Sequence, residues 1–286
     1  IPQTSTIASH LPRAVGVAIA IDRARKLGVE CTWPSDAIVV CSFGDASVNH
    51  STAVGAINTA LHSAYQGVPM PLLFVCEDNG IGISVKTPRR WIERTYGNRD
   101  GLAYFDADGC DLPATFDAAT AAADWVRTRR RPAFLHLRMV RLMGHAGSDY
   151  EPAYRRPEEI SAEFDRDPVL RTAKLLIGQG VLTPSEVLDR YEAKRSEVLE
   201  LAGEVAEAAQ LDSARAVMQP LALALEEAIA AAPASLAASV RSSDPDAPMT
   251  VALGINRALD DILDRYPEAI IFGEDVARKG GVYGVT

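Results

Sequence analysis

Asp45 and Asn79 each stand just after an apolar run, and their types and spacing could hold a metal ion. The two runs, residues 37–43 and 71–76, are typical of strands that are covered on both faces of a parallel sheet. Because ligands bind beyond the carboxyl ends of such strands, we expect the two side chains to lie close together. A carboxylate oxygen of Asp45, a carboxamide oxygen of Asn79 and the main-chain carbonyl of Ile81 could then bind a hard cation such as Mg²⁺.

The backbone around these residues could also accommodate a diphosphate. Gly44 would let the main chain approach a phosphate closely, and the amides of Ala46 and Ser47 at the start of the next helix could donate to it. On the second strand, Gly82 next to Ile81 frees the backbone to turn the carbonyl inward. These residues therefore predict a site for a metal and a diphosphate together.

A different role for Asp45 stays open at this point. A Gly-Asp pair after a strand is common, and the aspartate then usually caps the following helix. The Asp-Asn-Gly at residues 78–80, one crossover helix later, favours the metal site over the cap.

The elements around the site predict an α/β protein with a parallel sheet, a helical extension and the start of a second α/β domain. We expect strands at 37–43, 71–76 and 133–140, helices at 11–27, 48–65 and 112–130, and loops at 84–105 and 141–156. Further helices are expected at 168–178, 183–210, 213–232 and 249–266, and a further strand at 269–275. The predicted domains are 1–165, the helical extension 166–232, a linker rich in Ala, Ser, Pro and Asp at 233–248, and the truncated second domain 249–286.

Composition excludes several classes of protein. The chain has 286 residues and a net charge of −9, and it has no basic stripe of the kind that binds nucleic acid. Its four cysteines form no close pair with zinc or redox spacing, and a reducing compartment fits. No apolar run approaches the roughly 18 residues of a membrane span, and no signal peptide is visible. We therefore expect a cytoplasmic protein with no nucleic acid or membrane partner.

The two strand ends resemble a known motif. Gly44-Asp45-Ala46 followed by Asp78-Asn79-Gly80 looks like the thiamine diphosphate motif, which begins with Gly-Asp-Gly and ends with paired asparagines roughly thirty positions later. Here Ala46 replaces a glycine, Asp78 replaces the first asparagine, and the interval from Asp45 to Asn79 is 34 positions.

Three other segments narrow the resemblance to one group of enzymes. Residues 7–16 and 141–149 are similar to segments of 2-oxo acid dehydrogenase alpha subunits, the second being their active-site loop. Residues 249–286 look like the start of the beta subunit, so the two halves are expected to be fused, as in bacterial dehydrogenase components. Residues 82–88 are closer to the branched-chain relatives than to the pyruvate ones.

The resemblance implies a decarboxylating oxidoreductase that uses thiamine diphosphate and Mg²⁺ and passes an acyl group from a 2-oxo acid to a lipoyl-bearing acyltransferase. It implies metal ligands at Asp45, Asn79 and Ile81, a catalytic histidine at His145, and cofactor contacts at Ser5, Ile7, Gly44, Ala46, Ser47, Gly82 and His145. The expected assembly is a homodimer of fused chains or an α2β2-like equivalent. The glutamate that activates the cofactor should lie beyond Thr286, so the fragment alone is expected to be inactive.

Other functions remain open. An acetoin dehydrogenase would use the same cofactor, whereas a non-catalytic assembly scaffold would have a degenerate cofactor domain and a helical tail. An unrelated nucleotide-binding protein is disfavoured because the glycine-rich dinucleotide fingerprint and the phosphate-loop lysine are missing. His136 alternates with leucines in a predicted strand and is expected to be structural, and His50 is a weak second candidate near the metal loop.

Overall fold

The computed structural model describes residues 6–218, 248–273, 275–276, 280–281 and 284–286. The chain divides into two compact units, Ile1–Leu188 and Asp189–Thr286. All but the last residue of the predicted linker and most of the predicted helix at 213–232 lie outside the described residues. The four predicted domain boundaries stay predictions.

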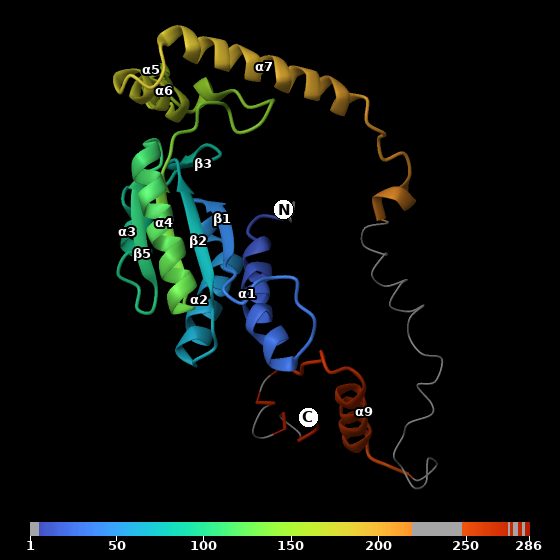
Figure 1. Cartoon of the computed structure of the whole chain (residues 1–286). Helices are drawn as coiled ribbons and strands as arrows, with labels where there is room; N and C mark the ends of the chain where they lie inside the picture. The colour runs from blue at the N-terminus through green and yellow to red at the C-terminus, as the bar shows by residue number, and fades with distance from the viewer. Residues whose placement is uncertain (1–5, 219–247, 274, 277–279, 282–283) are drawn as a thin grey trace. The chain divides into compact units, whose positions relative to one another are not determined.

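A four-stranded parallel sheet forms the centre of the first unit (Figure 1). Its order is β1 (Val39–Gly44), β2 (Leu72–Asp78), β6 (Ala133–Arg138) and β5 (Ala103–Asp108). Parallel pairing brings the carboxyl ends of β1 and β2 to the same edge, with Gly44 opposite Glu77. The predicted α/β class is therefore confirmed.

Helices cover the two faces of this sheet. One apolar cluster contains Phe74 and Cys76 of β2 and joins that face to α1 (His10–Leu27), α2 (Ser51–Tyr65) and α3 (Trp91–Tyr96). The second contains Leu73 and Val75 and joins the other face to α4 (Leu112–Arg129), which runs along the sheet in Figure 1. Successive residues of β2 belong alternately to the two clusters, because neighbouring side chains in a strand point to opposite faces of the sheet.

The sheet departs from the prediction at β1. This strand was expected to be covered on both faces, yet the Val40 side chain is 60% exposed, while Cys41 and Phe43 are buried. The reason is that β1 lies at the edge of the described sheet, and α4 packs against the other three strands instead.

The predicted loop at 84–105 was also wrong. It contains β4 (Val85–Lys86), which forms a short hairpin with β3 (Ile81–Gly82) just before it, the helix α3 and the start of the strand β5. These elements are short, and their many polar residues interrupt the regular spacing of apolar residues that would predict a helix or a strand. Tertiary packing stabilises them, since Ile92 and Tyr96 of α3 are buried in the core.

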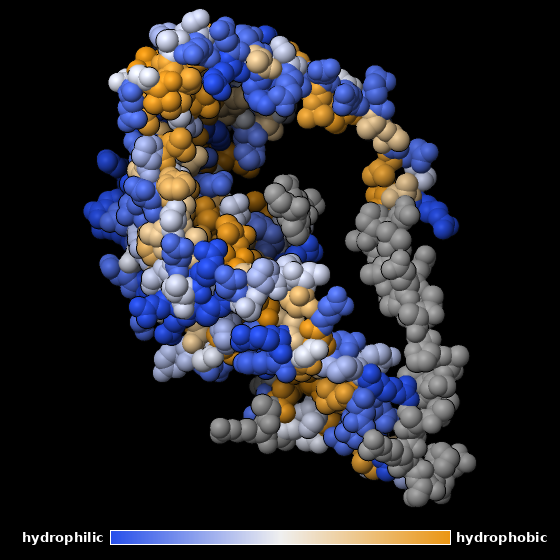
Figure 2. All heavy atoms as spheres, in the orientation of Figure 1, coloured by the Kyte–Doolittle hydropathy of each residue, from blue (hydrophilic) through white to orange (hydrophobic). Residues whose placement is uncertain are grey.

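Further helices follow the sheet. They are η2 (Glu151–Ala153), α5 (Pro157–Phe164), α6 (Pro168–Gly178) and α7 (Pro184–Ala206). A capping box precedes α7: the Thr183 N–H donates to Glu186 Oε2 at 2.8 Å, and the Glu186 N–H donates to Thr183 Oγ1 at 3.3 Å. Figure 2 shows hydrophobic side chains gathered over α5 and α6, where Phe164, Val169 and Leu170 are exposed.

The second unit contains α9 (Val251–Arg265), which agrees with the predicted helix at 249–266. The predicted strand at 269–275 was wrong, because residues 269–272 have no regular secondary structure and residue 273 lies in a bend. A strand needs a neighbour to pair its main-chain groups, and no described residue supplies one here. Across the described residues, no helix is long and apolar enough to span a membrane.

Candidate functional site

Asp45 is a buried carboxylate at the carboxyl edge of the sheet. Its side chain is 2% exposed, and the Thr87 hydroxyl donates to its Oδ2. Burial has the largest effect and raises the pKa of Asp45, and the nearby charge of Asp78 raises it further. Hydrogen bonds from the Thr87 hydroxyl and from the main-chain N–H of Asn79 lower the pKa and so oppose this shift. The main-chain amide of Asn79 therefore lies beside the Asp45 carboxylate, whereas the approach of the Asn79 carboxamide to Asp45 stays a prediction.

Gly82 and Ala46 pack directly against each other. A Cβ built on Gly82 would lie 2.4 Å from the Cβ of Ala46, far inside van der Waals contact. The turn after β1 and the hairpin after β2 therefore touch, and only glycine fits at position 82. This contact brings together two of the predicted cofactor residues.

The side chain of Asn79 and the main chain of Ile81 share one side of the β3–β4 hairpin. The Ile81 N–H donates to Asn79 Oδ1 at 3.1 Å, and the Thr87 N–H donates to Gly80 O at 2.9 Å. Since residues 80 and 87 form a hydrogen-bonded pair, the next pair, Ile81 with Lys86, is not hydrogen-bonded. The Ile81 carbonyl therefore points away from β4, towards the side on which its own N–H meets Asn79.

These oxygens fit a hard cation better than a soft one. Among the described residues there is no cluster of three or more His, Cys, Asp or Glu that could hold a metal. The set here instead combines one carboxylate, one carboxamide and one carbonyl, and Mg²⁺ is usually bound by one or two carboxylates plus phosphate oxygens and water. A divalent ion would also offset the desolvation of Asp45, because it stabilises the ionised form.

The turn after β1 differs from the prediction in one respect. Residues 47–49 form a short 3₁₀ helix, and α2 begins only at Ser51. The amides of Ala46 and Ser47 therefore precede α2 instead of starting it. His50 caps α2, with its Nδ1 accepting from the Thr52 N–H at 3.2 Å. The alternative role of Asp45 as the helix cap is wrong.

The amino-terminal residues reach the same strand. Ser5 lies outside the described residues, and Ile7 is 58% exposed. His10 Nε2 lies 2.8 Å from Ser42 O, so the start of α1 is held against β1 two residues before Gly44. The cofactor roles predicted for Ser5 and Ile7 stay predictions.

His145 lies in an exposed loop after β6. Its main-chain N–H donates to Asp149 Oδ2 at 2.7 Å, and the Tyr154 hydroxyl donates to the same oxygen at 2.5 Å. These bonds shape the loop and leave the imidazole in solvent. Its catalytic role stays a prediction.

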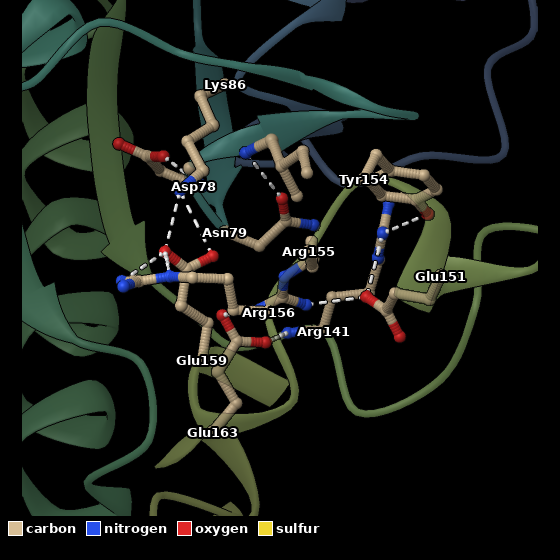
Figure 3. A network of polar contacts seen from close by, with 12 residues as sticks. Asp78, Asn79, Lys86, Arg141, Glu151, Tyr154, Arg155, Arg156, Glu159 and Glu163 are labelled. Atoms are coloured by element: carbon tan, nitrogen blue, oxygen red, sulfur yellow. Dashed lines mark hydrogen bonds and ion pairs between the residues drawn. The ribbon is translucent and has the colours of Figure 1, made fainter. Parts of the chain in front are cut away.

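Arg141 connects this loop to the hairpin that carries Ile81, and it was not among the predicted site residues. Its Nη1 donates to Ile83 O at 2.7 Å. Its Nη2 donates to Glu151 Oε1 at 2.9 Å and to the Tyr154 hydroxyl at 2.7 Å (Figure 3). Its Nε is buried and has no hydrogen-bond partner in the part of the chain that the structure describes. No local sequence signal predicts these contacts, because the partners lie up to 58 positions away.

Buried ion pairs hold the loop from the other side. Arg155 is 5% exposed and donates to Glu151 at 2.6 Å and to Glu163 of α5 at 2.6 Å. Lys86 of the hairpin pairs with Glu159 of α5 at 3.1 Å (Figure 3). A hollow of about 370 Å³ lies between the hairpin and α5, lined by Asn79, Gly80, Ile81, Lys86, Arg155, Glu159, Ala162 and Glu163. The hairpin with the predicted ligands is therefore fixed to both the loop and α5.

A parallel α/β sheet with polar groups gathered at its carboxyl edge is typical of cofactor-binding α/β proteins. Comparison with known families identifies this one. The model of the dehydrogenase E1 component family matches residues 1–214, and the chain belongs to that family. The resemblance to E1 alpha subunits is confirmed. The match does not extend to residues 249–286, so the fusion with a beta half stays a prediction.

Individual relatives agree with the family. The chain is 25% identical over 194 residues to the mitochondrial pyruvate dehydrogenase E1 component subunit alpha type I of Ascaris suum, covering 67% of this chain and 46% of that protein. It is 27% identical over 181 residues to the mitochondrial 2-oxoisovalerate dehydrogenase subunit alpha of Mus musculus, covering 62% of this chain and 38% of that protein. It is 28% identical over 168 residues to the pyruvate dehydrogenase E1 component subunit alpha of Rickettsia bellii, covering 57% of this chain and 49% of that protein. The chain thus spans less than half the length of these relatives.

Proposed function

We propose that this chain supplies the metal- and diphosphate-binding part of a 2-oxo acid dehydrogenase. The reaction is the decarboxylation of a 2-oxo acid and the transfer of the remaining acyl group to a lipoyl arm of a partner acyltransferase. The observation that carries the proposal is the buried carboxylate of Asp45 beside Asn79, with Gly82 packed on Ala46. Family membership supports the same reaction class.

In this proposal three residues hold the cation. Asp45 and Asn79 provide side-chain oxygens and Ile81 provides its carbonyl, while Gly44, Ala46 and Ser47 lie where the diphosphate would bind. When bound, thiamine diphosphate supplies the nucleophilic carbon and the electron sink for decarboxylation. The chain's own contribution is to bind and orient that group. Because burial raises the pKa of Asp45, we expect cation binding to displace a proton at low pH.

The loop residues have a separate role. The loop of His145 brings an imidazole, which can donate to an anion or move a proton near neutral pH. Arg141 holds the start of that loop against Ile83 of the hairpin. We infer that this connection keeps His145 near the metal site during turnover.

The assembly and location are part of the proposal. Residues 249–286 resemble the start of a beta subunit, and they include the helix α9 (Val251–Arg265). We propose fused halves, a homodimer or α2β2-like arrangement, a lipoyl-bearing acyltransferase as partner, and a bacterial cytoplasmic setting. Branched-chain 2-oxo acids are the favoured substrates on the basis of residues 82–88.

The direct test uses the full-length protein with thiamine diphosphate and Mg²⁺. Ferricyanide reduction is measured with a panel of 2-oxo acids and with acetoin, for the wild type, Asp45→Ala and the control Asp36→Ala. Asp36 is exposed and precedes β1, at the opposite edge of the sheet. We expect activity in the wild type and the control and its loss in Asp45→Ala.

Each other outcome has a defined meaning. Full activity in Asp45→Ala would overturn the assignment of the metal site. Activity with acetoin alone would identify an acetoin dehydrogenase. A folded protein that acts on no substrate in the panel would favour the assembly scaffold.

A further inference from the structure

Three side chains form a hydrogen-bonded row beneath the turn that carries Asn79. Asp78 Oδ2 lies 2.8 Å from His136 Nε2, and the Tyr104 hydroxyl lies 2.7 Å from His136 Nδ1. The residues come from β2, β6 and β5, so the row crosses three neighbouring strands. His136 is only 4% exposed. The row therefore lies inside the fold, and its Asp78 end meets the proposed site.

The donor and acceptor roles along the row follow from chemistry. A carboxylate only accepts, so His136 donates from Nε2 to Asp78. In the neutral ring Nδ1 then accepts from the Tyr104 hydroxyl. Burial raises the pKa of Tyr104, which keeps that hydroxyl protonated and able to donate. Both nitrogens of His136 are used, and the ring has one fixed orientation.

Asp78 also hydrogen-bonds to the turn that carries Asn79. Its Oδ1 accepts from the Gly80 N–H at 2.9 Å, and its main-chain carbonyl accepts from the Met139 N–H at 2.7 Å. Gly80 has a φ of 77°, a left-handed conformation that few side chains tolerate. The direction of the Asn79 carboxamide and of the Ile81 carbonyl thus depends on a turn that Asp78 holds in place.

We propose that His136 is a positioning residue for the divalent cation and acts through Asp78. The imidazole fixes the Asp78 carboxylate, and the carboxylate fixes the turn that presents the oxygens of Asn79 and Ile81. This inference deepens the proposed function and rests on it. Residues that do not bind the metal but orient its ligands through hydrogen bonds typically contribute about 10- to 100-fold to metal affinity.

The test is a titration of the full chain with Mn²⁺ in the presence of thiamine diphosphate, with free Mn²⁺ measured by electron paramagnetic resonance. His136→Phe keeps a ring beside Tyr104 but lacks the donor. We expect it to raise the Kd for Mn²⁺ by about 10- to 100-fold. His136→Gln can still donate an N–H to Asp78 and should recover most of the affinity.

A double-mutant cycle tests whether His136 acts through Asp78. Asp78→Ala alone should raise the Kd about as much as His136→Phe, and the two changes together should add little. Asp78 is 19% exposed, so its truncation also serves if His136→Phe does not fold. Fully additive effects, or a wild-type Kd in Asp78→Ala, would overturn the proposal.

Two controls separate this inference from the proposed function. Val126→Ala makes a cavity on the opposite face of the sheet and should lower the Tm without changing the Kd for Mn²⁺. If Asp45→Ala binds Mn²⁺ like the wild type, the metal site itself is wrong. If Asp45→Ala abolishes binding while His136→Phe behaves like Val126→Ala, only the positioning role of His136 is wrong.

Discussion

The contact between Gly82 and Ala46 allows a sharp prediction about Gly82→Ala. The added Cβ would lie 2.4 Å from the Cβ of Ala46, whereas carbon atoms pack best at about 3.5–4.0 Å. The two strand ends must therefore separate by about 1 Å. We expect a loss of about 1–3 kcal/mol in the free energy of unfolding, as for other overpacked sites.

The same displacement should weaken cation binding. Mg²⁺ and Mn²⁺ sites of this kind require near-octahedral oxygens at about 2.0–2.2 Å, so a shift of about 1 Å between Asp45 and Asn79 is not tolerated. We expect the Kd for Mn²⁺ in the presence of thiamine diphosphate to rise at least about tenfold. Urea unfolding and the Mn²⁺ titration measure the two effects separately.

A compensating change provides the decisive comparison. Ala46→Gly removes the methyl group that Gly82→Ala would strike, so the double variant should regain both stability and affinity, with a coupling energy of about 1–3 kcal/mol. Gly16→Ala is the matched control, because a Cβ there meets nothing within 4 Å, and it should be neutral or stabilise α1 by up to about 1 kcal/mol. Wild-type behaviour of Gly82→Ala, or no recovery in the double variant, would refute the close contact of the two strand ends.

Three further predictions concern the loop and the helix cap. Burial alone would raise the pKa of Glu151, but hydrogen bonds from Arg141 and Arg155 hold it below its usual value of 4.5. Its contribution to stability is therefore present above about pH 4.5 and lost as the pH falls through the folded-state pKa, which lies below 4.5. Glu151→Gln should cost about 3 kcal/mol at pH 7, and this cost should decrease as the pH falls below 4.5, as urea unfolding at a series of pH values would show. Arg141→Met removes the bond to Ile83, so amide hydrogen exchange in residues 142–149 should become faster while the sheet stays protected. His50→Ala should cost about 1 kcal/mol in thermal unfolding and leave the Kd for Mn²⁺ unchanged, because His50 caps α2 and is not proposed as a ligand.

The position of the site was predictable because it depends on short-range rules. Two apolar runs joined by one helix predict neighbouring parallel strands, and their polar ends must then meet at one edge. The ends of β1 and β2 do lie side by side, and the main-chain N–H of Asn79 lies near the Asp45 carboxylate. The same reasoning placed His136 in a strand as a structural histidine, and its two hydrogen bonds agree with that.

The parts that were missed depend on contacts between distant residues. Thr87 reaches Asp45 across 42 positions and Arg141 reaches Ile83 across 58, and no spacing rule connects them. The strand β5 was assigned to a loop because its sequence has only a weak pattern of apolar residues. The strand forms because it pairs with β6 and packs against α4, and the sequence does not show these contacts. The opposite error occurred at residues 269–273, where an apolar run has no strand to pair with among the described residues.

Anomalous scattering of Mn²⁺ in crystals of the full-length protein grown with thiamine diphosphate would locate the cation directly. We expect one strong peak about 2.1 Å from an oxygen of Asp45, the carboxamide oxygen of Asn79 and the carbonyl oxygen of Ile81. A peak at any other position, with these three oxygens turned away from one another, would contradict the proposed metal site.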